Sequence, residues 1–579
     1  MKVVFTDSII PGKAFSSYEY NETFLDNENY VNIKKIVQRN TATWLDEVAN
    51  SHSELSEYLA NKTRWWWVSP ASRLDMRPWG QEKFFKPLFF SLAILEWFLD
   101  QPDETSLTLV GCPVDVAEYL LELEPELIVK YSDAPLKRSI TKALIRSLFI
   151  LLKDIMNIMR FHIFNKSYQT DEIGQNILTY ELVHGLSIKN SYKYYFTSIL
   201  DCVDKKKITH LVIGAIQKKE RLLIENNNNN NKKIIAYDLC SIADLIKGIF
   251  HQLFLQCYFI KLIISSRTCI VNNRVTTKLW SRFLFSMFEE NILKPIIVYN
   301  VISKLLSNDS VKQIVFPYEE KGIERAMLFA ASEKNVKSIV FTPHPQHSLA
   351  VSMRDIKGSS CPKPNTYALC GSAYISFFKN WGGKENCDMQ VWGSEKGKLS
   401  HLPFSKTTKQ KKLRILLVLS HPNELKVFHK WLQSQYELYD LADFYIRCYK
   451  AVGIEHFDKL LLVVKKDFPD VKKVSGNLNN NLKDCDVVAF CATSAGIEAI
   501  NLGRAGFYLE LNDFFEINPC FNNLSKMQPS YSANEFLSRI KEWLEKDDIA
   551  KEKALLDQRS VTTGIFSKIN REKISNALL

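Results

Sequence analysis

The stretch from Asp486 to Asn512, DVVAFCATSAGIEAINLGRAGFYLELN, decides the fold because it predicts a strand, a tight turn, a helix and a second strand. Val487 to Phe490 is a short apolar run, and the residues after it are small enough to let a ligand approach the backbone. A helix is expected to begin near Ile497. Backbone N–H groups at a helix start, with hydroxyls beside them, suit a phosphate. The expected phosphate site consists of Thr493, Ser494, Ala495 and Gly496.

Glu498, in the first turn of this helix, has two interpretations. Its carboxylate can cap the helix, or it can accept hydrogen bonds from a ribose. The alternative to a binding site is an ordinary βαβ unit whose turn happens to be rich in small residues. The residues of the turn leave these interpretations open.

Two strands upstream of this stretch also end in polar residues. Arg414 to Leu419 predicts a strand that is followed by Ser420 and His421, polar residues that can form a loop facing a ligand or no more than a turn. Asp443 to Ile446 predicts another strand, and Arg447 and Lys450 follow it with positive charge suited to a phosphate.

The first half of the chain brings carboxylates and imidazoles to the ends of two predicted strands, Gln313 to Phe316 and Ser338 to Phe341, with a helix from Gly322 to Glu333 between them. Parallel sheets bind ligands beyond the carboxyl ends of their strands. A general base is therefore expected there. The candidates are Glu320, which we favour, then Glu319, His344 and His347. The alternative is that these side chains only stabilise the helix start or a loop.

Several motifs together resemble a family of bacterial surface-carbohydrate biosynthesis proteins with a GT-B glycosyltransferase fold. They are FPYEEKGIERAMLFAASE (316–333), FTPHPQHS (341–348), PKPNTYALCGSAYISFF (362–378), VWGSEKG (391–397) and the turn near Ser494. The resemblance covers roughly residues 310 to 515. It implies an α/β fold of two Rossmann-like domains facing a cleft, with the donor phosphates and ribose held at the Ser494 turn and Glu498. The sequence departs from the family in lacking a His-Pro pair after the strand that ends at Ile446.

The chain length predicts two domains, because 579 residues exceed what one ordinary core accommodates. We expect an N-terminal acceptor domain at 1–395 with helical insertions near 134–166 and 242–265. A polar, basic linker at 396–413 and a nucleotide-sugar-binding domain at 414–579 follow. Early strands are expected at Val3 to Phe5, Trp65 to Val68 and Leu107 to Val110. The three tryptophans from Trp65 are expected to be buried, with an aromatic sugar platform as the alternative.

The segment from Pro135 to Lys166 combines helically spaced apolar residues with a basic face that carries Lys142, Arg146, Lys153 and Arg160. This pattern is typical of a helix lying on anionic lipid. The alternative is a core helix whose polar side faces water. The run from Ile242 to Ser265 has the same two interpretations.

The net charge and the cysteine pattern bear on the partners and the location of the protein. The formal charge of +11 comes without a dense Lys/Arg block, so no nucleic acid partner is expected. The 12 cysteines show no pairing pattern, and the N-terminus lacks the apolar region of a signal peptide, so we expect a cytoplasmic protein, peripheral on the inner face of the membrane if the basic helices touch it. No bound metal is expected, because the GT-B fold that the chain resembles binds its donor without one and no obvious DxD motif ends a strand. No cofactor is expected either, since the nucleotide sugar is itself the substrate.

The sequence thus predicts a glycosyltransferase that uses a nucleotide sugar and a cell-surface polysaccharide or lipid-linked glycan acceptor. The alternatives are a sugar-nucleotide epimerase of the same fold and a non-catalytic scaffold for glycan assembly at the membrane. The fate of the nucleotide sugar distinguishes the three. A transferase usually hydrolyses it slowly, an epimerase converts it to an isomeric sugar, and a scaffold does neither.

Overall fold

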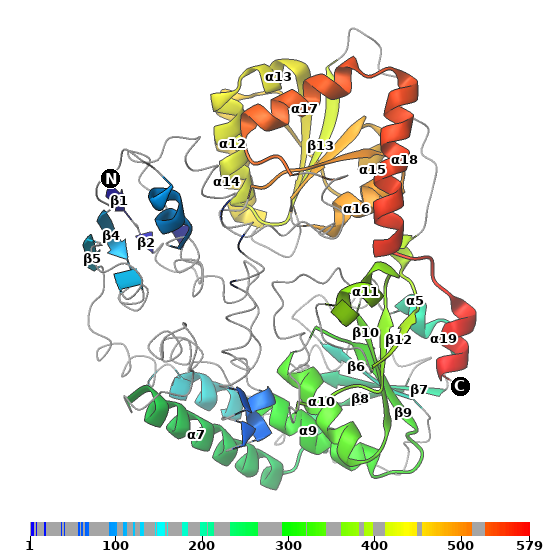
Figure 1. Cartoon of the computed structure of the whole chain (residues 1–579). Coiled ribbons are helices and arrows are strands. Elements are labelled where there is room, and N and C mark those ends of the chain that lie inside the picture. Colours follow the sequence, from blue (N-terminus) through cyan, green and yellow to red (C-terminus); the bar gives the residue numbers. More distant parts are fainter. Residues whose placement is uncertain are drawn as a thin grey trace.

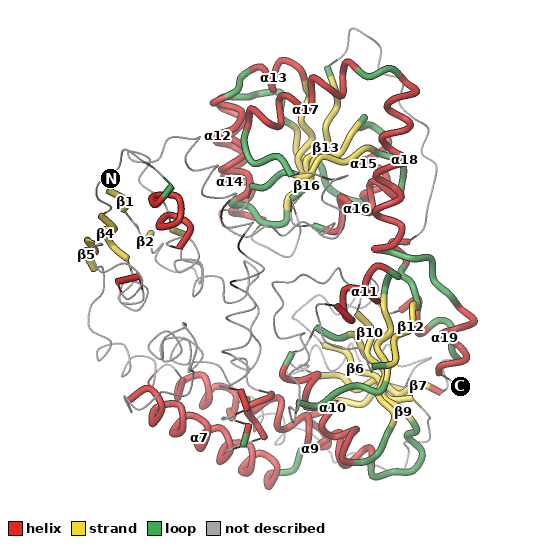
Figure 2. The backbone as a smooth tube through the Cα atoms, in the orientation of Figure 1, coloured by secondary structure: helices red, strands yellow, loops and turns green. Residues whose placement is uncertain are grey.

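The computed structural model describes most of the chain from residue 207 onward and shorter pieces before it. The long described ranges are 207–213, 232–264, 292–319, 321–342, 361–380, 387–397, 412–448, 454–491, 493–511 and 529–578. Among the shorter ones are 2–4, 64–68, 92–100, 108–112, 128–131, 147–156, 177–182 and 197–204. Two large sheets of parallel strands, each flanked by helices, dominate this part of the chain (Figures 1 and 2). The expected α/β class with two Rossmann-like sheets is therefore confirmed.

The second large sheet has the strand order β15-β14-β13-β16-β17. Its strands are β13 (Leu413–Leu419), β14 (Ala442–Cys448), β15 (Lys472–Lys473), β16 (Val487–Phe490) and β17 (Ala505–Tyr508). Its helices are α12 (Glu424–Ser434), α13 (Glu437–Leu441), α14 (Ile454–Asp467), α15 (Leu478–Lys483), α16 (Ser494–Asn501) and α17 (Ala533–Glu545). The central strands β13 and β16 are buried almost throughout, which explains their continuous apolar sequences.

The first large sheet has the order β12-β11-β10-β9-β6-β7-β8. Its strands are β6 (Ile177–Leu182), β7 (Ile208–Ile213), β8 (Lys232–Ile235), β9 (Gln313–Pro317), β10 (Lys337–Thr342), β11 (Thr366–Leu369) and β12 (Asp388–Val391). The helices along this part of the chain are α5 (Thr197–Leu200), η6 (Ala236–Leu239), α7 (Ile242–Ile264), α9 (Leu293–Leu306), α10 (Gly322–Glu333), α11 (Ala373–Asn380) and η8 (Glu395–Gly397). The strands predicted from Gln313 onward and the helix from Gly322 to Glu333 are confirmed within a few residues.

The N-terminal strands form separate small sheets. β1 (Lys2–Val4), β4 (Thr108–Cys112) and β5 (Ile128–Tyr131) pair in parallel, and β2 (Asp7–Ser8) pairs with β3 (Ser17–Tyr18) in antiparallel fashion. The strand predicted at Trp65 to Val68 is wrong, because residues Arg64–Val68 form the 3₁₀ helix η1. Trp65 is buried there, with ring centroids 5.3 Å from His251 of α7 and 5.2 Å from Tyr299 of α9. Large aromatic rings favour strands only weakly, and packing between two helices overrides that preference here.

The C-terminal segment runs from the second sheet back to the first. Helix α18 (Asp548–Ile565) packs beside α16, and helix α19 (Arg571–Leu578) lies against the first sheet (Figure 1). In that position the Gln313 amide donates to the Leu578 carbonyl at 2.9 Å, and the Ser575 hydroxyl donates to the Cys202 carbonyl at 3.0 Å. The range expected for the second domain, 414–579, thus includes a helix that packs on the other sheet.

The segment between α18 and α19 passes so close to the first sheet that only glycine fits opposite it. A Cβ added to Gly371 would lie 2.1 Å from the Ile565 carbonyl oxygen, and one on Gly397 would lie 2.2 Å from that of Ser567. Ser567 N–H also donates to the Cys370 carbonyl at 2.9 Å, and the Ser567 carbonyl accepts from Ser394 N–H at 2.8 Å. Backbone is thus fixed against backbone at this crossing.

We expect Gly371→Ala to destabilise the protein by about 1–3 kcal/mol, because its methyl group would meet backbone atoms that cannot rotate away. Gly564→Ala, in the last turn of α18, is the matched control. Its Cβ would meet its nearest neighbour, the Ala373 Cβ, at an ordinary 3.4 Å. Thermal unfolding should show a lower midpoint for Gly371→Ala only. Equal midpoints for the two variants would contradict the close approach.

Candidate functional site

The order of strands in each large sheet locates one place where a ligand fits. In the second sheet, β13 lies between β14 and β16, so the connections on its two sides run to opposite faces. The first sheet has the same kind of reversal where β6 lies between β7 and β9. At such a reversal the loops after the two central strands separate and leave a crevice beyond their carboxyl ends. A ligand is therefore expected beside the residues that follow β13, β16 and β9.

The turn after β16 leads into α16 as predicted, although the helix begins at Ser494, three residues before the expected start. Thr493 is the N-cap, and its hydroxyl accepts a hydrogen bond from Ala495 N–H at 3.3 Å. Gly496 is buried, and a Cβ there would lie 2.1 Å from the Phe490 ring. The small residues of this turn thus let α16 start directly over the end of β16, with its N–H groups directed at the carboxyl edge.

Lys396 of η8 reaches this helix start from the other sheet. Its ammonium group donates to the Ser494 hydroxyl at 2.7 Å and forms an ion pair with the Glu498 carboxylate at 2.9 Å. Its own carbonyl accepts from the Asn501 amide at 3.4 Å. The Lys396 side chain is only 14% exposed and that of Glu498 27%. A cation, a hydroxyl and a helix start therefore converge on one point.

Sequence reasoning missed Lys396, because it placed residue 396 at the start of a linker. The signal was present in VWGSEKG (391–397), where a glycine follows a lysine. Only the crossing of the C-terminal segment shows that this lysine lies beside α16.

The loop after β13 carries Ser420 and His421, which both donate hydrogen bonds to one carboxylate. Ser420 N–H donates to the Glu424 carboxylate at 2.7 Å and His421 N–H at 3.2 Å, while Asn423 N–H donates to His421 Nδ1 at 3.1 Å. The Ser420 hydroxyl also donates to Glu424. Ser420 and His421 therefore close the start of α12 around a buried carboxyl group.

Glu424 is the second residue that sequence reasoning missed. Burial raises the pKa of its carboxyl to about 7, although hydrogen bonds from Ser420, His421 and Cys491 oppose the shift. Because Cys491 follows β16 and Ser420 follows β13, this acid lies beneath the reversal point itself. A Ser-x-x-x-Glu spacing just after a predicted strand was the available signal.

Arg447, predicted to follow its strand, is the penultimate residue of β14, and its guanidinium donates to other parts of the protein. It donates to the Gly476 carbonyl at 3.0 Å and to the Asn481 side chain at 2.8 Å. Lys450, the other expected cation, lies outside the described residues.

On the first sheet, Glu319 lies just after β9 at the reversal point. Its carboxylate pairs with the Lys321 ammonium at 2.8 Å, and its N–H donates to the buried Glu324 carboxylate at 2.7 Å. Glu320, His344 and His347 lie outside the described residues. Glu319 therefore remains a candidate base whose charge is already matched by a lysine.

No group of three or more metal-binding side chains occurs among the residues that the structure describes. Within the same residues no helix is long and apolar enough to cross a bilayer.

Comparison with known proteins gives similarities in backbone only. No family model and no curated protein matches the chain. Similar solved structures include the trehalose-6-phosphate synthase OtsA (8% identity, 70% of this chain and 98% of OtsA, TM-score 0.37) and MurG from Acinetobacter baumannii (8%, 67% and 95%, 0.38). A glycosyltransferase from Rickettsia africae is also similar (10%, 70% and 98%, 0.39). Because each TM-score is below 0.5, we draw no functional conclusion from these similarities.

The raised pKa of Glu424 predicts a pH dependence of stability. In the unfolded chain this carboxyl loses its proton near pH 4.5, whereas the folded protein keeps it up to about pH 7. Between these values the folded state binds the extra proton, so the free energy of unfolding falls as the pH rises, by at most about 1.4 kcal/mol per pH unit.

Glu424→Gln should remove this part of the pH dependence, which thermal unfolding between pH 4.5 and 7 would measure. Glu542→Gln, which replaces a carboxylate with a 69% exposed side chain, is the control and should follow the wild type. Parallel profiles for Glu424→Gln and wild type would show that the pKa is not raised.

Proposed function

We propose that the protein is a metal-independent glycosyltransferase of the GT-B type that uses a nucleotide sugar. The observation that carries the proposal is the meeting of Lys396, the Ser494 hydroxyl and the start of α16 at the reversal point of the second sheet. Positive charge and the positive end of the helix dipole at that place suit the phosphates of a nucleotide. Glu498, beside them, is positioned to accept hydrogen bonds from a ribose once the donor competes for Lys396.

The first sheet supplies the acceptor side of the proposal. Glu319 follows β9 at the reversal point of this sheet, and in the sequence Glu320 comes next while His344 and His347 come after β10. An inverting transferase needs a base beside the acceptor hydroxyl. Since Glu319 is paired with Lys321, Glu320 is the better candidate for that base.

The acceptor in this proposal is a cell-surface polysaccharide or a lipid-linked glycan of a bacterium. The protein would then work in the cytoplasm at the inner face of the cytoplasmic membrane, with no nucleic acid partner. These finer assignments derive from the motifs between residues 310 and 515.

Ser494→Asp should weaken nucleotide binding strongly while the fold survives, because an aspartate is favourable at a helix start but repels a phosphate there. Thermal shift with CMP, UDP, GDP and dTDP identifies the base, and titration of the best ligand should show a loss of affinity of about tenfold or more. Ser494→Ala, which removes the hydroxyl without adding charge, is the control and should bind more tightly than Ser494→Asp. Wild-type affinity in Ser494→Asp would remove the phosphate from this site.

Glu320→Gln should reduce turnover by about 100-fold to 10,000-fold and leave donor affinity unchanged, as expected for loss of a general base. Glu319→Gln, made separately, should have the smaller effect because its carboxylate pairs with Lys321. Glu542→Gln serves again as the control. If both variants keep wild-type turnover, the base lies elsewhere and His344 is tested next. Loss of donor affinity in place of turnover would mean that the roles of the two sheets are reversed.

A further inference from the structure

Helix α7 exposes an apolar face where a helix on a protein surface ordinarily exposes a polar one. Its exposed large side chains are Ile242, Ile246, Phe250, Leu253 and Phe254, between 39% and 68% exposed. These positions recur at helical spacing and therefore share one side of α7. The opposite side is buried and includes the polar residues Gln252 and Gln256.

A second helix beside α7 shows the same inversion. Residues 147–156 are helical, and Leu148, Phe149, Leu152 and Met156 on this helix are between 43% and 67% exposed. The Gln256 amide of α7 donates to the buried Ser147 hydroxyl, so the two helices lie in contact. Single exposed apolar residues are common on proteins, but several on each of two adjacent helices mark an interaction site. We call these nine apolar residues the two-helix surface.

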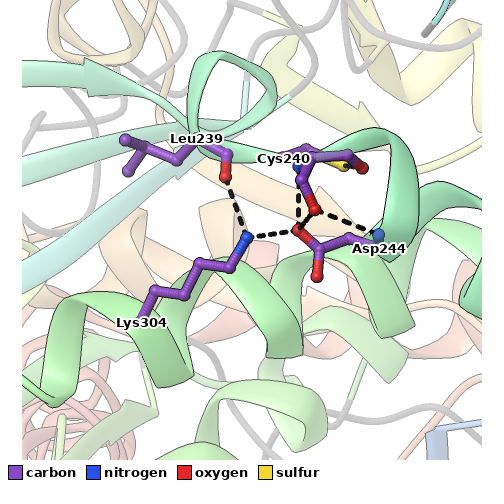
Figure 3. Close-up of polar contacts among 5 residues, drawn as sticks. Leu239, Cys240, Asp244 and Lys304 are labelled. Atoms are coloured by element: carbon purple, nitrogen blue, oxygen red, sulfur yellow. Dashed lines mark hydrogen bonds and ion pairs between the residues drawn. The ribbon is translucent and has the colours of Figure 1, made fainter. Parts of the chain in front are cut away.

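The acidic residues of both helices are matched by lysines of α9. Asp154 is buried and pairs with Lys294 at 3.2 Å. Asp244 accepts hydrogen bonds from Ser241 N–H at 2.8 Å and from the Ser241 hydroxyl at 2.7 Å, and it also pairs with Lys304 (Figure 3). Lys304 donates in addition to the Leu239 carbonyl at 3.4 Å, which fixes the start of α7 to α9.

The charges that remain at the exposed side are of one sign. Among the described residues of the two helices, the exposed charged side chains are Lys153, Lys247 and Lys261. Apolar side chains bordered by lysines complement an anionic bilayer. The apolar side chains can enter the acyl-chain region, and the lysines are attracted by the negatively charged head groups. A second copy of the chain fits less well, because a two-fold contact would bring together two surfaces that are both bordered by lysines.

We propose that the two-helix surface docks on an anionic lipid bilayer, with both helices lying in the plane of the interface. The inference names the membrane-binding surface, and it holds whether or not the protein transfers a sugar. Vesicle binding and nucleotide binding therefore test the two proposals separately.

The test is cosedimentation of the full chain with vesicles of phosphatidylcholine alone or of an equal mixture with phosphatidylglycerol. The wild type should bind the mixed vesicles more tightly, and salt should weaken the binding. Combining Phe149→Gln, Ile246→Gln and Phe250→Gln should weaken binding by about tenfold or more, as should combining Lys153→Glu, Lys247→Glu and Lys261→Glu.

The matched control replaces exposed apolar residues elsewhere, by Leu462→Gln and Val463→Gln on α14 with Ile549→Gln on α18. It should bind vesicles like the wild type, and all three combined variants should keep the wild-type unfolding midpoint and nucleotide affinity. Failure of the wild type to bind mixed vesicles would overturn the proposal, as would wild-type binding by the glutamine variant of the two-helix surface. A wild-type dimer that this variant converts to a monomer, without vesicle binding, would assign the surface to a second copy.

Discussion

The contact between residues 564–568 and the glycines of the first sheet is the constraint on which the rest of the architecture depends. At Gly371, Gly393 and Gly397 the two backbones approach so closely that a Cβ would lie 2.1–2.2 Å from a carbonyl oxygen. Because α18 precedes this contact in the chain and α19 follows it, α18 lies along the second sheet and α19 along the first. One hydrophobic core cluster accordingly contains residues of both sheets, among them Val418, Phe490 and Phe341. The two sheets share a core as well as a chain.

The same contact explains why a lysine from one sheet completes a site on the other. Ser394 is held by Ser567, and Lys396 follows it by two residues, with its ammonium 5.5 Å from the Phe566 ring. The contact with Ser567 thus fixes the backbone of η8 in the position from which the Lys396 side chain contacts Ser494 and Glu498. A cation in this position offsets the carboxylate of Glu498, so the start of α16 remains favourable for an anion although Glu498 lies in its second turn rather than, as expected, in its first. Without that lysine, Glu498 would repel the phosphates that we place beside it.

The strands were predictable where burial makes their sequences continuously apolar. β9, β10, β13 and β16 were found within two residues, because central parallel strands are buried on both faces. η1 was missed because Trp65 is buried between side chains of two helices that sequence alone does not bring together. The site was predictable for the residues that follow their own strand, such as Thr493 and Ser494. Lys396 was not, since it lies 98 residues from Ser494, and Glu424 was not, since its raised pKa arises from burial among loops after different strands.

The two-helix surface shows why an apolar helix with basic residues can be interpreted from its sequence as a lipid-facing helix or as a core helix. The positions of its acidic side chains in the structure distinguish the two. In the sequence, Asp154 and Asp244 weaken the argument for a lipid-facing helix, because an acid near an anionic surface is repelled. In the structure both acids turn toward α9, where they pair with Lys294 and Lys304. Burial alone would raise the pKa of Asp244, but the hydrogen bonds from Lys304 and Ser241 hold this pKa below its ordinary value. The acids therefore fasten the helices to the protein, and the exposed side keeps its lysines and its apolar residues. Periodicity identifies which residues share a face, but only the partners of the charged ones decide which face is presented outward.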